Sequence, residues 1–160
     1  MILFLDFDGV LHPDAVYLTK RGVELRAEGG LFMWSSLLSD ALANHPDIRI
    51  VLSTSWARQI SYDHARKALP LPLRSCVIGA TWHSAMGRGW PDRIPWDVQT
   101  RYNQIATYLN RLPYPVPWVA IDDDDEGWPD HQREHLVLTD SMQGLSKPGV
   151  LNELINKLET

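Results

Sequence analysis

Residues 1–13 read MILFLDFDGVLHP, and the prediction of the fold begins from this stretch. Four apolar residues, Ile2 to Leu5, run directly into Asp6, and Asp8 follows two positions later. A continuous apolar run of this length is typical of a strand that is covered on both faces in a parallel sheet. Two carboxylates so close together repel each other and resist joint ionisation unless a cation holds them. The stretch therefore predicts a buried strand that ends at a charged site.

Further apolar runs alternate with amphipathic stretches along the rest of the chain. The runs that we expect to form strands, after Ile2–Leu5, are Ile48–Leu52, Cys76–Ile78, Trp118–Ile121 and Leu136–Leu138. The helices expected from apolar spacing and capping residues cover residues 31–42, Trp56–Leu69, Asp97–Leu112 and Pro148–Leu158, the last with Ser146 as N-cap, and a long loop is expected over Ala80–Pro95. This alternation predicts a three-layer α/β/α sandwich around a five-stranded parallel, Rossmann-like sheet.

The composition limits the class of protein. The 160 residues are 44% hydrophobic and 22% charged, as expected of one globular domain, which we place at residues 1–160. The net charge of -5 argues against tight non-specific binding to nucleic acid or to an anionic membrane. The apolar start is too short for a signal peptide, and no apolar run would span a bilayer. A single cysteine, Cys76, excludes an internal disulfide, so we expect a cytoplasmic protein.

Two acidic clusters follow predicted strands. Asp6 and Asp8 follow the first strand, and the run Asp122–Asp125 follows the fourth. Ligands of open parallel sheets bind beyond the carboxyl ends of the strands. The two clusters are therefore expected to meet at one site.

Three segments together resemble the haloacid dehalogenase (HAD) superfamily of phosphatases. They are DFDGVLHP after the first strand, Ser-Thr-Ser after the second, and WVAIDDDD at the fourth. The resemblance extends over essentially the whole chain, in the right order. It is greatest to the small HAD domains associated with RNA-repair proteins, which share LDFDGVLHP, a Ser-rich segment that ends in Trp, and a late LVLTD…GLS stretch. The first motif is specific, whereas the other two would be weak alone.

The resemblance implies a chemical role for each acid. Asp6 is the nucleophile that attacks phosphorus and becomes an aspartyl-phosphate. Asp8 protonates the leaving oxygen as general acid and then activates water as general base. A hard cation, expected to be Mg²⁺, is held by Asp6, the backbone carbonyl of Asp8 and the acids of the fourth strand. Among these, the family pattern selects Asp122 and Asp123, with Asp123 as the direct ligand, and leaves the two acids that follow as solvated loop residues.

The resemblance also assigns Ser53 to the phosphoryl group, to which its hydroxyl would donate a hydrogen bond. The backbone N–H groups of Thr54 and Ser55 join it at a helix N-terminus, unless these two residues only cap the helix.

A further implied element is a cation that neutralises the phosphate. Arg101 fits by its position before the acidic strand, and its guanidinium would bind in a bidentate manner. Arg88 and Arg93 in the preceding loop are competing candidates.

Only residues 13–30 are spare between the first two predicted strands, enough for a loop or a small hairpin but not for a cap domain. A nearly open site suits a macromolecular or terminal phosphate, or closure by another subunit. Together with the resemblance to RNA-repair domains, it predicts a phosphate on a nucleotide or on a nucleic-acid end, in preference to a sugar phosphate. Trp56 and Trp128, each just after a site segment, are candidate walls on which a base would stack.

Two other classes of protein remain as alternatives. A phospho-accepting signalling receiver also has acids at strand ends and a Lys-Pro segment such as SKPGVLNELINKLE, but its phospho-accepting Asp ends the third strand, where this chain has none. A catalytically silent HAD-like binding module would be expected to lack Asp6 or Asp8, and both are present.

Overall fold

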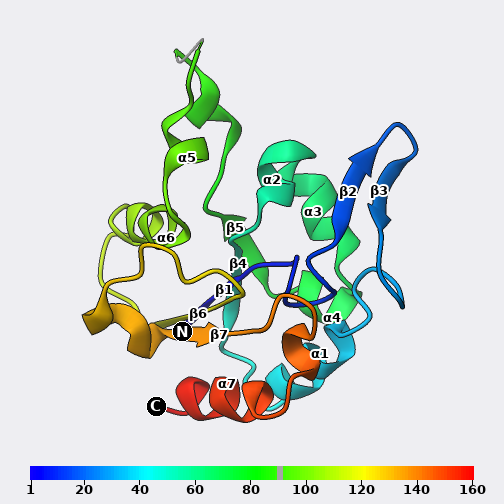
Figure 1. Ribbon diagram of the computed structural model, residues 1–160. Coiled ribbons are helices and arrows are strands. Elements are labelled where there is room, and N and C mark those ends of the chain that lie inside the picture. Colours follow the sequence, from blue (N-terminus) through cyan, green and yellow to red (C-terminus); the bar gives the residue numbers. More distant parts are fainter. Residues whose placement is uncertain (90–91) are drawn as a thin grey trace.

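The computed structural model describes residues 1–89 and 92–160, and a five-stranded parallel sheet forms its centre (Figure 1). The strands are β1 (Ile2–Leu5), β4 (Arg49–Leu52), β5 (Val77–Ala80), β6 (Trp118–Asp122) and β7 (Leu136–Leu138), in the order β5-β4-β1-β6-β7. Each neighbouring pair of strands is parallel. The predicted fold class is confirmed, and each predicted strand is present with small differences at its ends.

The alternation of side chains along each strand produces two separate cores. Leu3 and Leu5 of β1 pack in the larger core, together with side chains of α1 (Ser35–Leu42), α3 (Tyr62–Ala68), α4 (Leu71–Arg74) and α7 (Val150–Leu158). Ile2 and Phe4 of the same strand point to the other face, where α6 (Arg101–Leu109) packs. Figure 1 shows α6 and α7 on different sides of the sheet. Both faces of β1 are therefore covered, which explains its uninterrupted apolar sequence.

Two predicted helices are each broken into two. The first consists of α2 (Ser55–Gln59) and α3, because Ser61 has extended backbone between them and its hydroxyl accepts from the N–H of His64. The second consists of α5 (Pro95–Val98) and α6, and here the hydroxyl of Thr100 accepts from the N–H of Asn103. Both breaks use a hydroxyl as an N-cap. The second one makes Arg101 the first residue of α6.

Other boundaries also differ from the prediction. The predicted N-cap Ser146 is wrong: Ser146 lies in a 3₁₀ segment (Gly144–Ser146), and Gly149, with φ 91, precedes α7. The predicted long loop contains a 3₁₀ turn at Ser84–Gly87, and its residues 90 and 91 lie outside the described part. A third 3₁₀ segment covers Asp130–His135.

The spare residues after β1 form the small hairpin that the sequence allowed. Strands β2 (Val16–Thr19) and β3 (Gly22–Leu25) pair with each other in antiparallel fashion and do not join the main sheet. Figure 1 shows this hairpin beside the sheet, away from the layer of α6. None of the helices in the described ranges combines the length and the apolarity that crossing a membrane requires.

The order of the strands determines where a ligand can bind. The chain runs outward from β1 to β4 and β5, and then returns to the other side of β1 to form β6 and β7. The connections therefore diverge between β1 and β6, and a crevice opens there at the carboxyl ends of the strands.

Candidate active site

The two acidic clusters meet in the crevice between β1 and β6. Asp6 directly follows β1, and its N–H donates to the carbonyl of Ile121 (3.2 Å). Asp122 is the last residue of β6. The parallel pairing of these central strands thus brings together two carboxylates that are far apart in the sequence.

A pocket of about 380 Å³ lies at this point. Acidic side chains dominate its wall, with one guanidinium and one hydroxyl residue: Asp6, Asp8, Asp14, Ser55, Arg101, Asp122, Asp123 and Asp124. Such an excess of carboxylates over cations requires either protonation or a bound cation.

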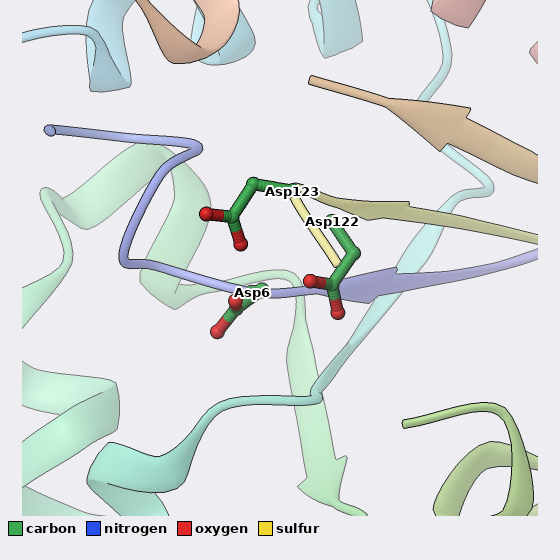
Figure 2. A group of neighbouring side chains, drawn as sticks. All are labelled: Asp6, Asp122 and Asp123. Carbon is green, nitrogen blue, oxygen red and sulfur yellow. The ribbon is translucent and has the colours of Figure 1, made fainter. Parts of the chain in front are cut away.

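Three of these carboxylates lie close enough together to hold a metal ion. One oxygen each from Asp6, Asp122 and Asp123 lies within 4.8 Å of the others, and Figure 2 shows the three side chains converging. Gly9 makes the approach of Asp123 possible, because it has φ 76 and a Cβ at this position would overlap the Asp123 carboxylate. Three carboxylate ligands suit a hard cation such as Mg²⁺.

Arg101 pairs with two of the three carboxylates. Its Nε lies 3.0 Å from Oδ2 of Asp122, and its Nη2 lies 3.7 Å from Oδ1 of Asp6. The remaining nitrogen, Nη1, donates to the side-chain oxygen of Gln104 (3.1 Å), whose amide donates to the carbonyl of Trp96 (2.9 Å). The guanidinium is therefore held in one orientation, with its charge directed at the nucleophile candidate.

Burial and mutual repulsion perturb the acids. Burial raises the pKa of Asp6 to about 6, with a smaller contribution from Asp8 and an opposing one from Arg101. Burial, followed by the charge of Asp6, raises the pKa of Asp123 to about 7. The pKa of Asp122 is also raised, by burial and then by Asp6, although Arg101 acts against the shift. A bound cation would stabilise the ionised form of all three acids.

Asp8 has a different environment from the other acids. Its Oδ1 lies 2.8 Å from Nε2 of His12 and accepts the indole N–H of Trp56 (3.0 Å). The carboxylate of Asp8 lies outside the group of Asp6, Asp122 and Asp123 that could hold a metal ion. A contribution from the backbone carbonyl of Asp8 stays a prediction.

The structure places the three hydroxyl residues after β4 differently from one another. Ser53 is fully buried, and its Oγ has neither a hydrogen-bond partner among the described residues nor a place in the pocket wall. Thr54 is the N-cap of α2 and accepts from the N–H of Trp56 (3.3 Å). Ser55 is the residue of the three that lines the pocket. The assignment of Ser53 to the phosphoryl group remains a prediction, with Ser55 as a new candidate.

The two tryptophans are not substrate walls. Trp128 is 4% exposed and packs against Tyr102 and Trp118 in the second core. Trp56 is 6% exposed, and its indole N–H is directed at Asp8. Both tryptophans lie next to site segments in the sequence, which suggested a surface for base stacking. Because their rings are buried, a ligand cannot stack on them.

Some residues of the site were not expected. Asp14, just before the hairpin, lines the pocket, and burial followed by the charge of Asp8 raises its pKa. Asp124 was expected to be a solvated loop acid, and it is exposed but also lines the pocket.

Gln104, which orients Arg101, was not expected either. A helix that began at residue 101 would have placed Gln104 one turn after the arginine. The competing Arg88 and Arg93 are exposed and do not line the pocket.

The sheet order, the acid pair after the central strand and the facing acids of β6 define a HAD-type domain. A family model described as the HAD domain in Swiss Army Knife RNA repair proteins matches residues 2–150. The chain therefore belongs to this family, and the membership indicates phosphatase-type chemistry. Searches among curated proteins and among solved structures found no match.

Proposed function

We propose that the protein is a Mg²⁺-dependent phosphatase, one domain over residues 1–160, that forms an aspartyl-phosphate on Asp6. One observation carries the proposal: Asp6 is a buried carboxylate that belongs to a group of acids able to hold a metal ion and that also pairs with the guanidinium of Arg101. A nucleophile that attacks a phosphate needs positive charge on more than one side, because the incoming group is itself an anion.

The chain's own residues then have distinct roles. Asp6 attacks phosphorus, and Arg101 pairs with the phosphoryl oxygens while Gln104 holds its orientation. Asp8 protonates the leaving oxygen and later accepts a proton from water. Ser53 or Ser55 donates a hydrogen bond to the phosphoryl group. When a metal is bound, Asp6, Asp122, Asp123 and the carbonyl of Asp8 would hold it, and it would neutralise developing negative charge.

The alternatives receive less support. A receiver would need an acid at the end of β5, and this strand ends at Ala80 and is followed by Thr81. A silent binding module does not require a buried acid beside a fixed guanidinium. Burying the carboxylate of Asp6 costs free energy, and acids perturbed in this way cluster at functional sites.

The proposed substrate is a phosphate on a nucleotide or on a nucleic-acid end. The family description refers to RNA repair. In the described part of the chain, the segment between β1 and α1 forms the small β2–β3 hairpin and no cap domain, and Asp14, just before the hairpin, lines the pocket. The buried tryptophans do not offer a stacking surface, so selectivity is expected to come from the phosphate and the adjoining sugar. We place the reaction in the cytoplasm, as the single free Cys76 suggests.

The decisive experiment compares Asp6→Asn with a matched exposed acid, Asp47→Asn. With Mg²⁺ and an aryl phosphate, Asp6→Asn is expected to lose all measurable turnover, because the amide cannot attack phosphorus. Asp47→Asn should match the wild type. Turnover by Asp6→Asn at the wild-type rate would refute the proposed nucleophile.

The substrate class is tested separately. We expect kcat/KM for a 3′-phosphorylated oligonucleotide or a mononucleotide to exceed that for a hexose phosphate. A hexose phosphate as the best substrate would contradict this part of the proposal and leave the phosphatase chemistry intact.

A further inference from the structure

Two N–H groups are directed at the same oxygen of Asp8. The indole Nε1 of Trp56 lies 3.0 Å from Oδ1, and Nε2 of His12 lies 2.8 Å from it. The indole N–H can only donate, so this oxygen must accept. No hydrogen bond to Oδ2 is present among the described residues, although Asp8 lines the pocket.

A backbone contact fixes which nitrogen of His12 carries the proton. The N–H of Phe32 donates to Nδ1 of His12 (3.1 Å), so Nδ1 must present a lone pair. The ring is then neutral with its proton on Nε2, and Nε2 donates to Oδ1 of Asp8. The imidazole is fully buried, so water cannot compete for either nitrogen.

An aromatic cluster holds both donors in place. Phe7 and Phe32 pack edge-to-face against Trp56, with ring centroids 5.5 Å and 5.3 Å away, and Phe32 packs in the same way against His12 (5.0 Å). Phe32 adopts a left-handed backbone conformation (φ 59), which is costly for a residue with a Cβ. Two contacts of Phe32 offset this cost. Its N–H donates to Nδ1 of His12, and its ring packs against His12 and Trp56.

Burial alone does not explain the contact of Trp56 with Asp8. The indole N–H groups of Trp96 and Trp128 are also buried, and neither has a hydrogen-bond partner among the described residues. A buried indole in this protein therefore does not automatically find an acceptor. Trp56 is the case in which the donor is directed at a side chain of the pocket.

We propose, on the basis of the phosphatase function proposed above, that His12 and Trp56 are positioning residues that leave Oδ2 of Asp8 as the only oxygen that gives and takes the proton. Oδ1 uses its lone pairs to accept two N–H groups, so an added proton resides on Oδ2. Both donors can stay in place whether Asp8 is neutral or ionised, so the site needs no rearrangement between the two steps.

The two steps then balance at one atom. In the first, an oxygen of Asp6 bonds to phosphorus as the bond to the leaving oxygen breaks, and the proton of Oδ2 moves to that leaving oxygen. In the second, the oxygen of a water bonds to phosphorus as the bond to Asp6 breaks, and the water proton moves to Oδ2. Asp6 returns as a carboxylate, and Asp8 returns in its protonated form.

The first test removes one donor and keeps the ring. Trp56→Phe is expected to lower kcat about 10-fold for an alkyl phosphate, whose leaving oxygen needs the proton, and less than about 2-fold for a dinitrophenyl phosphate, which needs it little. KM should stay within about 2-fold for both substrates. The matched control is Trp128→Phe, which removes an indole N–H without a partner and should leave both rates unchanged.

The second test uses His12. His12→Ala should show the same difference between the two substrates, and His12→Gln should recover most of the alkyl phosphate rate, since its amide can donate from the position of Nε2. In the wild type, a long-range ¹H–¹⁵N spectrum should show His12 protonated on Nε2 and not on Nδ1. This last measurement needs no turnover.

The outcomes separate this inference from the proposed function. A wild type without phosphatase activity would refute the proposed function, whereas the tautomer of His12 would still be open to measurement. Equal losses of kcat for both substrates in Trp56→Phe, or a His12 protonated on Nδ1, would overturn the positioning role while Asp6 remains the nucleophile. No loss in Trp56→Phe with either substrate would overturn it as well.

Discussion

The acids after β1 and the acids after β6 reach the same pocket by different routes. The two acids after β1 have contrasting surroundings: Asp6 is buried beside Arg101, and Asp8 accepts from two neutral N–H groups. The acids at the end of β6 also differ among themselves, and Asp124 is exposed although it lines the pocket. Asp122 is buried, Asp123 is half-buried, and Asp125 is paired with Arg133 (2.7 Å) outside the pocket.

The difference shows that the surroundings of an acid change within a few positions of a strand end. Asp6, which directly follows β1, and Asp122, the last residue of β6, are desolvated and have raised pKa values, whereas the side-chain hydrogen bond from Arg133 lowers the pKa of Asp125. The identity of the residue is the same in each case. Its chemistry is set by burial and by the sign of the neighbouring charge.

The largest expected effect tests the burial of Asp6 through stability. Without a divalent cation, the pKa of Asp6 is about 6 in the folded protein, against an ordinary value of 3.8 for an aspartate. The folded state then binds more protons than the unfolded state between these pH values, so the free energy of unfolding falls as pH rises through this window. Asp6 alone contributes about 2–3 kcal/mol to the fall.

Urea unfolding with EDTA at several pH values between about 4 and 7 measures this effect. Asp6→Asn is the control and should show a flatter dependence, because an amide does not titrate. Mg²⁺ should restore stability at the upper end of the range, since it stabilises the ionised acids. An equal pH dependence in the wild type and in Asp6→Asn would show that Asp6 is not desolvated as described.

A smaller effect is expected for metal affinity along the run after β6. Asp122→Asn should weaken Mg²⁺ binding about 10- to 100-fold, because one of three converging carboxylates loses its charge. Asp125→Asn should bind Mg²⁺ as the wild type does, since its side chain faces Arg133. Calorimetric titration measures the Mg²⁺ affinity of both variants. Equal weakening in the two variants would show that Asp122 and Asp125 do not differ in their contribution to metal binding.

The smallest expected effect is a loss of catalytic efficiency that distinguishes Arg101, which pairs with Asp122, from Arg133, which pairs with Asp125. Arg101→Lys should lower kcat/KM about 10-fold, because an ammonium cannot contact Asp6, Asp122 and Gln104 together. Arg133→Lys is the control, as its guanidinium is exposed and pairs outside the pocket. Steady-state kinetics that show the same value for both variants would mean that the orientation of Arg101 is unimportant.

The fold was largely predictable because each strand is a short apolar run bounded by polar residues. Ile2–Leu5 and Leu136–Leu138 have the predicted bounds, and the acids that follow β1 and β6 lie together as expected. Parallel strands covered on both faces leave a strong signal in sequence. The breaks at Ser61 and Thr100 were missed because a hydroxyl residue is tolerated within a helix as well as at its start.

The rest of the site depends on contacts that no local pattern encodes. Phe32 reaches His12 across 20 positions, and Trp56 reaches Asp8 across 48. The sequence suggested that the ring face of Trp56 would stack on a base, whereas in the structure its indole N–H donates to Asp8. The direction of a side chain depends on how it packs against distant segments of the chain. The periodicity of apolar residues does not predict that packing.

The central place of β1 in the sheet has a consequence for the synthesis of the protein. Asp6 and Asp122 are 116 positions apart (122 − 6), and their strands are direct neighbours. At about 5–20 residues per second, a ribosome needs about 6–23 s to travel from one to the other. During that time the nascent chain carries β1 and the acid pair that follows it without β6, which supplies Asp122. The group of acids that could hold a metal ion is therefore assembled late in synthesis, when β6 has left the ribosome.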